Sequence, residues 1–153
     1  MIEKIKITRT YLLSIVDELS AEELNKIPAG FNNNIIWNLA HLTAAQQGMC
    51  YVRAGVPTSV DEEYLTPFKS GTKPEGFIDD GKIKVLKELL LTSLDQFETD
   101  RHTNLFDNYP AWKTRSGVAI NNIDDAVEFI LFHEGVHVGC IMAMKRIIKP
   151  KLL

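Results

Sequence analysis

The segment from Asn122 to Pro150 constrains the fold more than any other part of the chain. Asn122 can cap the first turn of a helix, acidic residues follow it directly, and basic residues precede Pro150, so both ends complement a helix dipole. The helix so defined has about 26 residues and a length of about 39 Å. Its apolar side chains lie nearly all round the axis, at Val127, Phe129, Ile130, Leu131, Phe132, Val136, Val138, Ile141, Met142 and Met144. A helix without a polar side is either deeply buried or shared with a partner, so this segment needs more than one neighbour.

Three further segments show the spacing of amphipathic helices. They cover residues 2 to about 19, 35 to about 54 and 82 to about 101, and in each of them aliphatic residues recur at intervals of three and four. Asn34 can cap the second segment, and Ser20 with Glu23 forms a capping box for a short helical turn before it. No segment has a convincing strand pattern. The sequence therefore predicts an all-α four-helix bundle.

Two long connections separate the predicted helices. Residues 54 to about 80 contain repeated Gly and Pro, and residues 103–121 contain Pro110, Gly117 and mixed aromatics. Connections of this length allow crossovers rather than simple hairpins. The sequence has no internal repeat, low-complexity tract or flexible linker, so we expect residues 1–153 to form a single domain.

Charge and composition limit the partners and the compartment. The chain has 17 basic and 20 acidic residues and a formal net charge of -3, so it lacks the basic field that nucleic acids require. No uninterrupted apolar run approaches the roughly 20 residues of a membrane-spanning helix, and the first residues do not resemble a signal peptide. Cys50 and Cys140 are too few for a disulfide framework. We expect a cytoplasmic protein with reduced cysteines that binds neither nucleic acid nor membrane.

Three histidines in apolar helical surroundings are the strongest candidates for chemistry. His133 and His137 are four positions apart, so a helix places their imidazoles one turn apart on the same face. His41 lies beside Leu42 and can point into the bundle as a third ligand. An isolated histidine of this kind is usually a hydrogen-bonded core residue. Two neighbouring imidazoles would each need a partner and would repel when protonated, so the pair predicts a shared divalent cation with open positions for water or substrate.

Glu134 lies between the paired histidines and completes the letters H-E-x-x-H. In zinc proteases this glutamate is the general base, but the chain has no histidine or acidic residue after His137 to act as their downstream third ligand. A di-iron site is also unsupported, because Asn38 and Thr99 occupy the positions where a second E-x-x-H would need its glutamate. Glu134 is a candidate catalytic residue that orients a water or a ligand imidazole, and the alternative is a carboxylate that reaches solvent.

Several other residues can contribute to the same site. Cys140 shares the face of His137, where it can approach the ion or be a small core residue. Trp37 lies one turn before His41, where it can wall the cavity or be core. The second connection carries four residues that can cover the mouth of the site and bind an anionic ligand, or can simply be solvated: Tyr109, Trp112, Lys113 and Arg115. His102 follows the third long helix, where a solvated histidine is favoured, and we leave it out of the site.

The segments Asn34–Leu42 and Phe132–Gly139 resemble those of the DinB/YfiT-like superfamily, and the likeness spans almost the whole chain. In that family a histidine on the second long helix and an H-x-x-x-H pair on the fourth form a divalent metal site inside a four-helix bundle. The resemblance therefore implies His41, His133 and His137 as metal ligands. Characterised members include transferases and isomerases that use bacillithiol, mycothiol or glutathione. Many members have glutamine after the glycine where this chain has a cysteine, so the pocket differs from theirs at that position.

The resemblance implies a metalloenzyme in which Zn²⁺, Ni²⁺ or a similar ion lowers the pKa of a low-molecular-weight thiol and presents it to an electrophile. We therefore expect a thiol-dependent S-transferase that acts on small molecules. A second hypothesis keeps the ion and makes the protein a hydrolase with Glu134 as base. A third is a dimeric bundle that binds a small ligand without catalysis, with the histidines in its core. The apolar circumference of the last helix predicts a homodimer contact.

Overall fold

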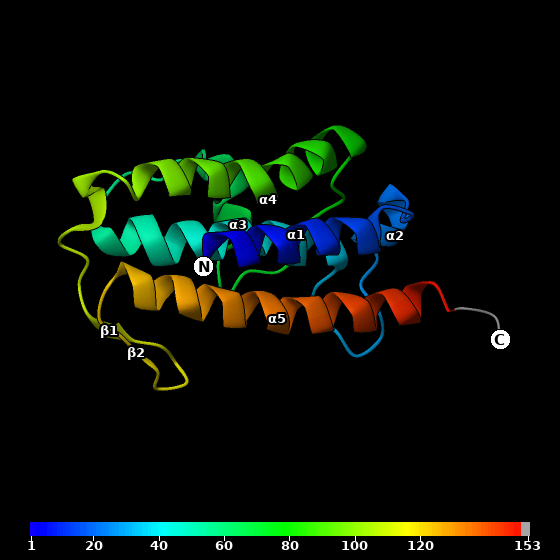
Figure 1. Ribbon diagram of the computed structural model, residues 1–153. Helices are drawn as coiled ribbons and strands as arrows, with labels where there is room; N and C mark the ends of the chain where they lie inside the picture. The colour runs from blue at the N-terminus through cyan, green and yellow to red at the C-terminus, as the bar shows by residue number, and fades with distance from the viewer. Residues whose placement is uncertain (151–153) are drawn as a thin grey trace.

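Four long helices lie side by side in the computed structural model, which describes residues 1–150 (Figure 1). They are α1 (Ile2–Val16), α3 (Ile35–Gln47), α4 (Asp80–Asp100) and α5 (Ile123–Ile148). The all-α four-helix bundle predicted from the sequence is confirmed. Helix α5 has 26 residues, the length that its end signals predict.

Short elements complete the described part of the chain. They are helix α2 (Ala21–Asn25), the π-helical turn η1 (Gly48–Val52) that continues α3, and the 3-10 turns η2 (Glu62–Tyr64), η3 (Thr66–Phe68) and η4 (Asn104–Phe106). Strands β1 (Trp112–Lys113) and β2 (Ala119–Ile120) pair antiparallel, with Trp112 opposite Ile120. The sequence pattern does not predict this hairpin, because strands of two residues are too short to show alternation.

Side-chain caps begin the helices where the sequence places them. Ser20 and Glu23 form the predicted capping box at α2. Asn34 and Asn122 accept backbone N–H bonds at the starts of α3 and α5. Helix α4 begins slightly earlier than predicted, because Asp79 caps it by accepting a backbone N–H bond.

Polar contacts fix the directions of neighbouring helices. Helix α1 packs against α4 and α5, and α3 packs against the same two, so α1 and α3 face each other across a diagonal of the bundle. Lys6 near the start of α1 pairs with Glu98 near the end of α4 at 2.7 Å, so these helices are antiparallel. Lys145 near the end of α5 donates to the Ile15 carbonyl near the end of α1, so these helices are parallel. The colours in Figure 1 show that α3 and α4 also run in the same direction.

The two long connections have different geometries. Residues 53–79 join α3 to the parallel helix α4, so they run back along the bundle as the predicted crossover (Figure 1). Residues 101–122 join α4 and α5 at one end of the bundle, so a crossover is wrong for this connection. Tyr51 donates to Asp100 at 2.6 Å and holds the end of η1 against the end of α4.

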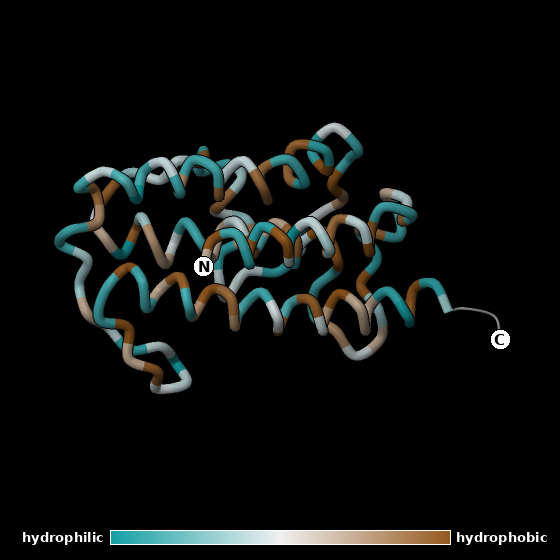
Figure 2. Tube along the Cα trace, viewed as in Figure 1, coloured by the Kyte–Doolittle hydropathy of each residue, from teal (hydrophilic) through white to brown (hydrophobic). Residues whose placement is uncertain are grey.

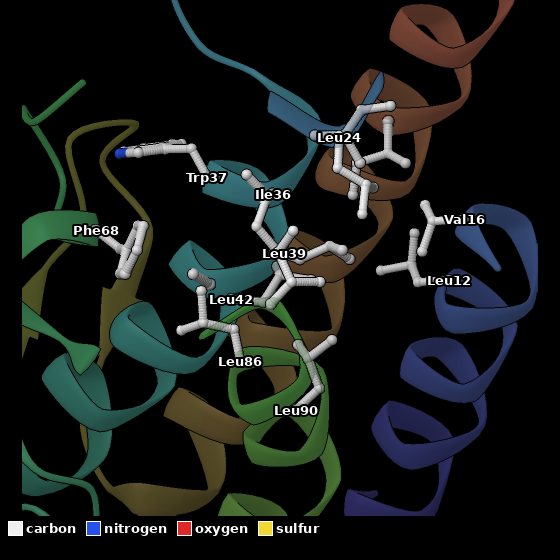
Figure 3. Packing of buried hydrophobic residues seen from close by; sticks show 14 of the residues in the cluster. Leu12, Val16, Leu24, Ile36, Trp37, Leu39, Leu42, Phe68, Leu86 and Leu90 are labelled. Carbon is white, nitrogen blue, oxygen red and sulfur yellow. The ribbon is translucent and has the colours of Figure 1, made fainter. Parts of the chain in front are cut away.

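A buried polar layer divides the hydrophobic core. One apolar cluster lies in the half of the bundle next to α2 (Figure 3), and the other lies in the half next to η4. On α1, Arg9 lies between Ile5 of one cluster and Leu12 of the other. Each of the long helices, α3 with its continuation η1, has a buried polar residue between its members of the two clusters: Arg9, Gln46, Ser93 and Glu134. All of them are at most 2% exposed, so the layer lies deep in the protein.

Arg9 is the centre of the polar layer. Its Nε and Nη2 donate to Glu134 Oε1 at 3.0 and 2.7 Å. The guanidinium also donates to the carbonyl of Leu90 at 2.8 Å and to that of Leu42 at 3.0 Å. One side chain of α1 therefore contacts the other long helices, α3, α4 and α5. A buried ion pair often stabilises a protein no more than apolar residues of the same volume do, but removal of one partner leaves an uncompensated charge in the core.

One side of α5 stays uncovered. Phe132, Val136 and Ile147 are 64%, 47% and 49% exposed, whereas α1 and α3 cover the other side. Figure 2 shows that apolar residues recur along the length of this helix. Within residues 1–150, α5 is the helix that is long and apolar enough to cross a membrane, and 28% of its apolar window is buried in the bundle. Core helices of soluble proteins meet the same criterion, so the criterion does not identify what covers this face.

Arg9→Met should destabilise the bundle by about 3–5 kcal/mol, because Glu134 then keeps a buried charge without a counter-ion. Arg9→Met combined with Glu134→Leu should recover most of the loss, since both charges are gone. Urea unfolding measures the difference. Lys69→Met, which breaks the exposed pair with Glu62, is the control and should leave stability almost unchanged. A double variant no more stable than Arg9→Met alone would contradict this role for the pair.

Candidate metal centre

The structure brings His41, His133 and His137 together, as the sequence predicts. His133 and His137 lie one turn apart on α5 with ring centroids 4.5 Å apart. The His41 ring on α3 lies 5.3 Å from the ring of His133 and 4.9 Å from that of His137. One ring nitrogen of each residue lies within 4.8 Å of the other two. Nitrogen atoms this close can share one metal ion.

Two contacts fix the ring of His41. Its Nδ1 lies 2.6 Å from the carbonyl oxygen of Phe68. A carbonyl can only accept, so Nδ1 carries the proton and Nε2 keeps its lone pair. Trp37 stacks on the ring with centroids 4.7 Å apart and planes 10° apart. Because Phe68 belongs to η3, the crossover between α3 and α4 orients a ligand that α3 presents.

Asn38 orients His137. Asn38 Oδ1 lies 2.8 Å from Nδ1 of His137, while Asn38 Nδ2 donates to the Asn34 carbonyl at 2.7 Å and to Asn33 Oδ1 at 3.0 Å. The amide nitrogen is committed to these acceptors, so the amide oxygen faces the imidazole and accepts its Nδ1 proton. Nε2 of His137 is therefore left as the metal-binding atom.

Burial keeps the imidazoles neutral. Removal from water lowers the pKa of His133 from 6.5 to about 4, and the charges of His41 and Arg9 add to the effect. Burial likewise lowers the pKa of His137 from 6.5 to about 3, with smaller effects from the other two histidines. The pKa of His41 is also lowered by burial, against an opposing effect of the Phe68 carbonyl. Neutral imidazole is the form that binds a metal, so no proton has to be displaced at pH 7.

The donor set fits a divalent ion of borderline character. Nitrogen ligands at about 2.0–2.1 Å from a tetrahedral ion lie about 3.4 Å from one another, a separation that small side-chain rotations can reach here. His133 makes no hydrogen bond to another residue of the described chain, so both of its ring nitrogens are available. Imidazole suits Zn²⁺ and Ni²⁺. A cavity of about 660 Å³ adjoins His41 and His133 and gives a small molecule access to the remaining coordination positions.

Glu134 lies in the core rather than at the open side of the site. It is 0% exposed and belongs to the polar layer through its two bonds from Arg9. A carboxylate that reaches solvent is therefore wrong. The helix turns about 100° per residue and carries Glu134 away from the face of His133. Its Oε2 has no hydrogen-bond partner within residues 1–150. The catalytic role of Glu134 stays a prediction, and its pairing in the core does not favour it.

Other candidates from the sequence take different places. The ligand group found in the described chain holds the three histidines and does not include Cys140 or His102. Cys140 is a free, half-buried thiol, so its approach to the ion gains no support. Trp37 is both a core residue, 6% exposed, and a wall for the His41 ring.

The hairpin brings three of the four predicted mouth residues to the site. Trp112, Lys113 and Arg115 line the cavity that contains two of the histidines. Tyr109 is 8% exposed instead, and its hydroxyl donates to the Met49 carbonyl at 2.6 Å and accepts from the Trp112 indole at 2.8 Å. The prediction is therefore wrong for Tyr109, which attaches the hairpin to η1 rather than covering the mouth.

Three contributors to the site were not predicted. Asn38 lies three residues before His41, and this helical spacing is a signal that could have identified it. Phe68 contributes a backbone carbonyl, and Arg53 lines the cavity from just beyond η1. Neither has a sequence signal, because both depend on where the crossover and η1 lie in space.

Comparison with known proteins agrees with this geometry. Residues 4–141 match the DinB superfamily, a span that includes the three histidines and Asn38. A search of curated proteins found no match. The matched span therefore contains the whole of the candidate metal site.

Metal-free protein should lose stability as the pH falls from about 6.5 toward 4. Unfolded histidines take up protons near pH 6.5, whereas folded His133 and His137 do so near pH 4 and 3. In this window the unfolded state binds more protons, so acid favours unfolding. Thermal unfolding with a chelator at each pH measures the loss, which should be shallower in a His133→Gln, His137→Gln double variant. His102→Gln is the control, and equal slopes in all three proteins would contradict the prediction.

Proposed function

The chain belongs to the DinB superfamily, and from this premise we propose that it is a metal-dependent thiol S-transferase acting on small molecules. One observation carries the proposal. Three neutral imidazoles, two of them already oriented through Nδ1, converge beside an open cavity. Such a set leaves coordination positions for a reactant, as a catalytic metal site does and a closed structural site does not. The choice of S-transfer comes from the characterised members of the family.

A divalent ion held by these histidines would lower the pKa of a thiol and so provide a nucleophile at neutral pH. In the transfer, the thiol proton passes to solvent, sulfur forms a bond to an electrophilic carbon, and the leaving group departs with its electron pair. The contribution of the neighbouring residues is to orient the histidine rings. Phe68 and Asn38 hold two of the rings in place, and Trp37 prevents the His41 ring from tilting.

The two alternative functions receive less support. A hydrolase needs a base beside the bound water, and Glu134 is instead paired with Arg9 in the core. A bundle with purely structural histidines needs hydrogen-bond partners for each ring, and His133 has none within the described chain. A metal ion satisfies that ring without a further protein group.

We propose a homodimer through the exposed face of α5. Phe132, Val136 and Ile147 form an apolar stripe on this face. Gly135 and Gly139 lie beside it, and a methyl group added at either would meet no atom within 4 Å, so a second helix can approach closely there. A second copy of the chain offers the same stripe, as a two-fold interface requires. A membrane is the competing occupant of this surface, because the helix is also long and apolar enough to associate with one.

Cobalt(II) titration tests the metal and the thiol together. We expect saturable binding with visible absorption bands, and 2-mercaptoethanol should add a sulfur-to-cobalt charge-transfer band. His137→Ala should weaken cobalt binding by more than about 100-fold while the helical circular dichroism stays unchanged, because loss of an orienting partner alone costs about 10–100-fold. His102→Ala is the matched control and should bind as wild type does.

The outcomes of this titration are separable. No cobalt binding by the wild-type protein would overturn the metal site. Cobalt binding without a charge-transfer band would overturn the thiol step and leave the hydrolase as the better proposal.

Phe132→Glu with Val136→Glu should convert the dimer into a monomer, because negative charges of the two copies would then be buried against each other. Sedimentation velocity at several concentrations measures the state. Tyr11→Glu, which changes a 50% exposed aromatic residue on α1, should leave the dimer intact. A wild-type monomer at high concentration would refute the interface, and binding of that monomer to neutral lipid vesicles would assign the face to a membrane.

A further inference from the structure

The cavity beside the histidines has the opposite charge to the rest of the chain. The whole chain carries a formal net charge of -3. The basic residues that line the cavity are Arg53, Lys69, Lys113 and Arg115, and within residues 1–150 the acidic residue that lines it is Glu62. A concave site lined by one sign of charge concentrates ligands of the other sign. The site is therefore arranged to attract an anion.

Glu62 does not cancel this field. Its Oε2 accepts from Lys69 Nζ at 2.9 Å and from Thr66 Oγ1 at 2.7 Å. These contacts lower the pKa of Glu62 and keep it ionised. Glu62 and Lys69 thus neutralise each other, and the remaining positive charge comes from Arg53, Lys113 and Arg115.

Arg53 is held in place without losing its donors. Its guanidinium carbon lies 4.5 Å from the centre of the Trp112 ring, a cation–π contact that orients the plane of the group. It has no hydrogen-bond partner among residues 1–150, so its N–H groups are free for a ligand. A planar guanidinium with free donors matches the two oxygens of a carboxylate.

The hairpin holds the other two cations at the same cavity. Lys113 lies in β1, and Arg115 lies in the turn that the Thr114 N–H to Val118 carbonyl bond of 2.9 Å closes. Tyr109 fastens the hairpin to the Met49 carbonyl at 2.6 Å. Positive groups from two distant parts of the chain therefore meet over the metal-site histidines.

The remaining walls are largely apolar. The aromatic and aliphatic residues among them are Met49, Val52, Leu65, Trp112 and Phe129. A small inorganic anion such as phosphate has no apolar part and would leave these surfaces uncovered, whereas an organic molecule would cover them. The cavity thus combines an anion-binding rim with an apolar interior.

We propose that the substrate of this site is a small organic acid whose carboxylates bind Arg53 and Arg115 while its carbon skeleton lies against Trp112. The proposal rests on the proposed function, because it places the reacting end of the acid at the histidines. Carboxylate binding to arginine needs neither the metal nor the reaction, so it can be measured independently of both.

Binding of succinate to the metal-free protein, followed by NMR chemical shifts, tests the charge recognition alone. Succinamide, the neutral molecule of the same shape, should bind about tenfold more weakly, since two exposed ion pairs contribute up to about 1 kcal/mol each. Arg53→Gln with Arg115→Gln should remove the difference between the two ligands. Arg146→Gln, which deletes the same kind of charge outside this cavity, should retain it. Equal binding of both ligands, or no saturable binding of succinate, overturns the proposal.

A charge series of thiols separates this inference from the proposed function. On the cobalt-loaded protein, mercaptosuccinate should give the charge-transfer band at about tenfold lower concentration than 2-mercaptoethanol, and the advantage should shrink at high salt. If no thiol gives the band but succinate still binds the metal-free protein, the thiol step fails and the acid site stands. If all thiols give the band at the same concentration and succinate binds the metal-free protein no better than succinamide, the acid site fails and the thiol step stands.

Discussion

The contact of Arg9 with three other helices is the interaction on which the arrangement of the bundle depends. Its guanidinium binds Glu134 on α5 and the carbonyl of Leu42 on α3. Glu134 follows His133 in the sequence, and Leu42 follows His41. The same group that aligns α3 with α5 therefore aligns two of the three metal ligands. Since a buried ion pair adds little net stability, we propose that its effect lies in selecting one register among several that an apolar core would accept.

The metal ligands are likewise held in place by contacts with neighbouring residues. His41 and His137 receive their orientation from Phe68 and Asn38, so their Nε2 atoms point inward before any ion binds. Burial holds the rings neutral, which removes competition from protons. The cost of this arrangement is stability in acid, because buried neutral histidines resist a charge that the unfolded chain accepts freely. Burial of the imidazoles thus both prepares them to bind a metal ion and makes the fold sensitive to acid.

Local and distant interactions differ in how far the sequence predicts them. Helices, caps and the pairing of His133 with His137 depend on residues three or four apart, so periodicity alone predicts them. Placing His41 with that pair also succeeds, because the apolar stripe of α3 decides which way the ring faces. The ion pair of Arg9 and Glu134 joins positions 125 residues apart, and no local pattern marks it. The role of the Phe68 carbonyl cannot be predicted from the sequence for a different reason. Every residue has a carbonyl, and only the path of the crossover brings this one to His41.

Three successive residues of α5 face three different environments. Phe132 is 64% exposed on the outer face, His133 belongs to the metal site, and Glu134 is buried in the polar layer. Steps of about 100° separate them, so one turn of the helix meets the outer face, the metal site and the polar layer in succession. The same rotation explains why the letters H-E-x-x-H do not make a protease here. A glutamate one residue after a ligand faces either the ion or a neighbouring helix, and Arg9 determines that in this bundle it faces the core.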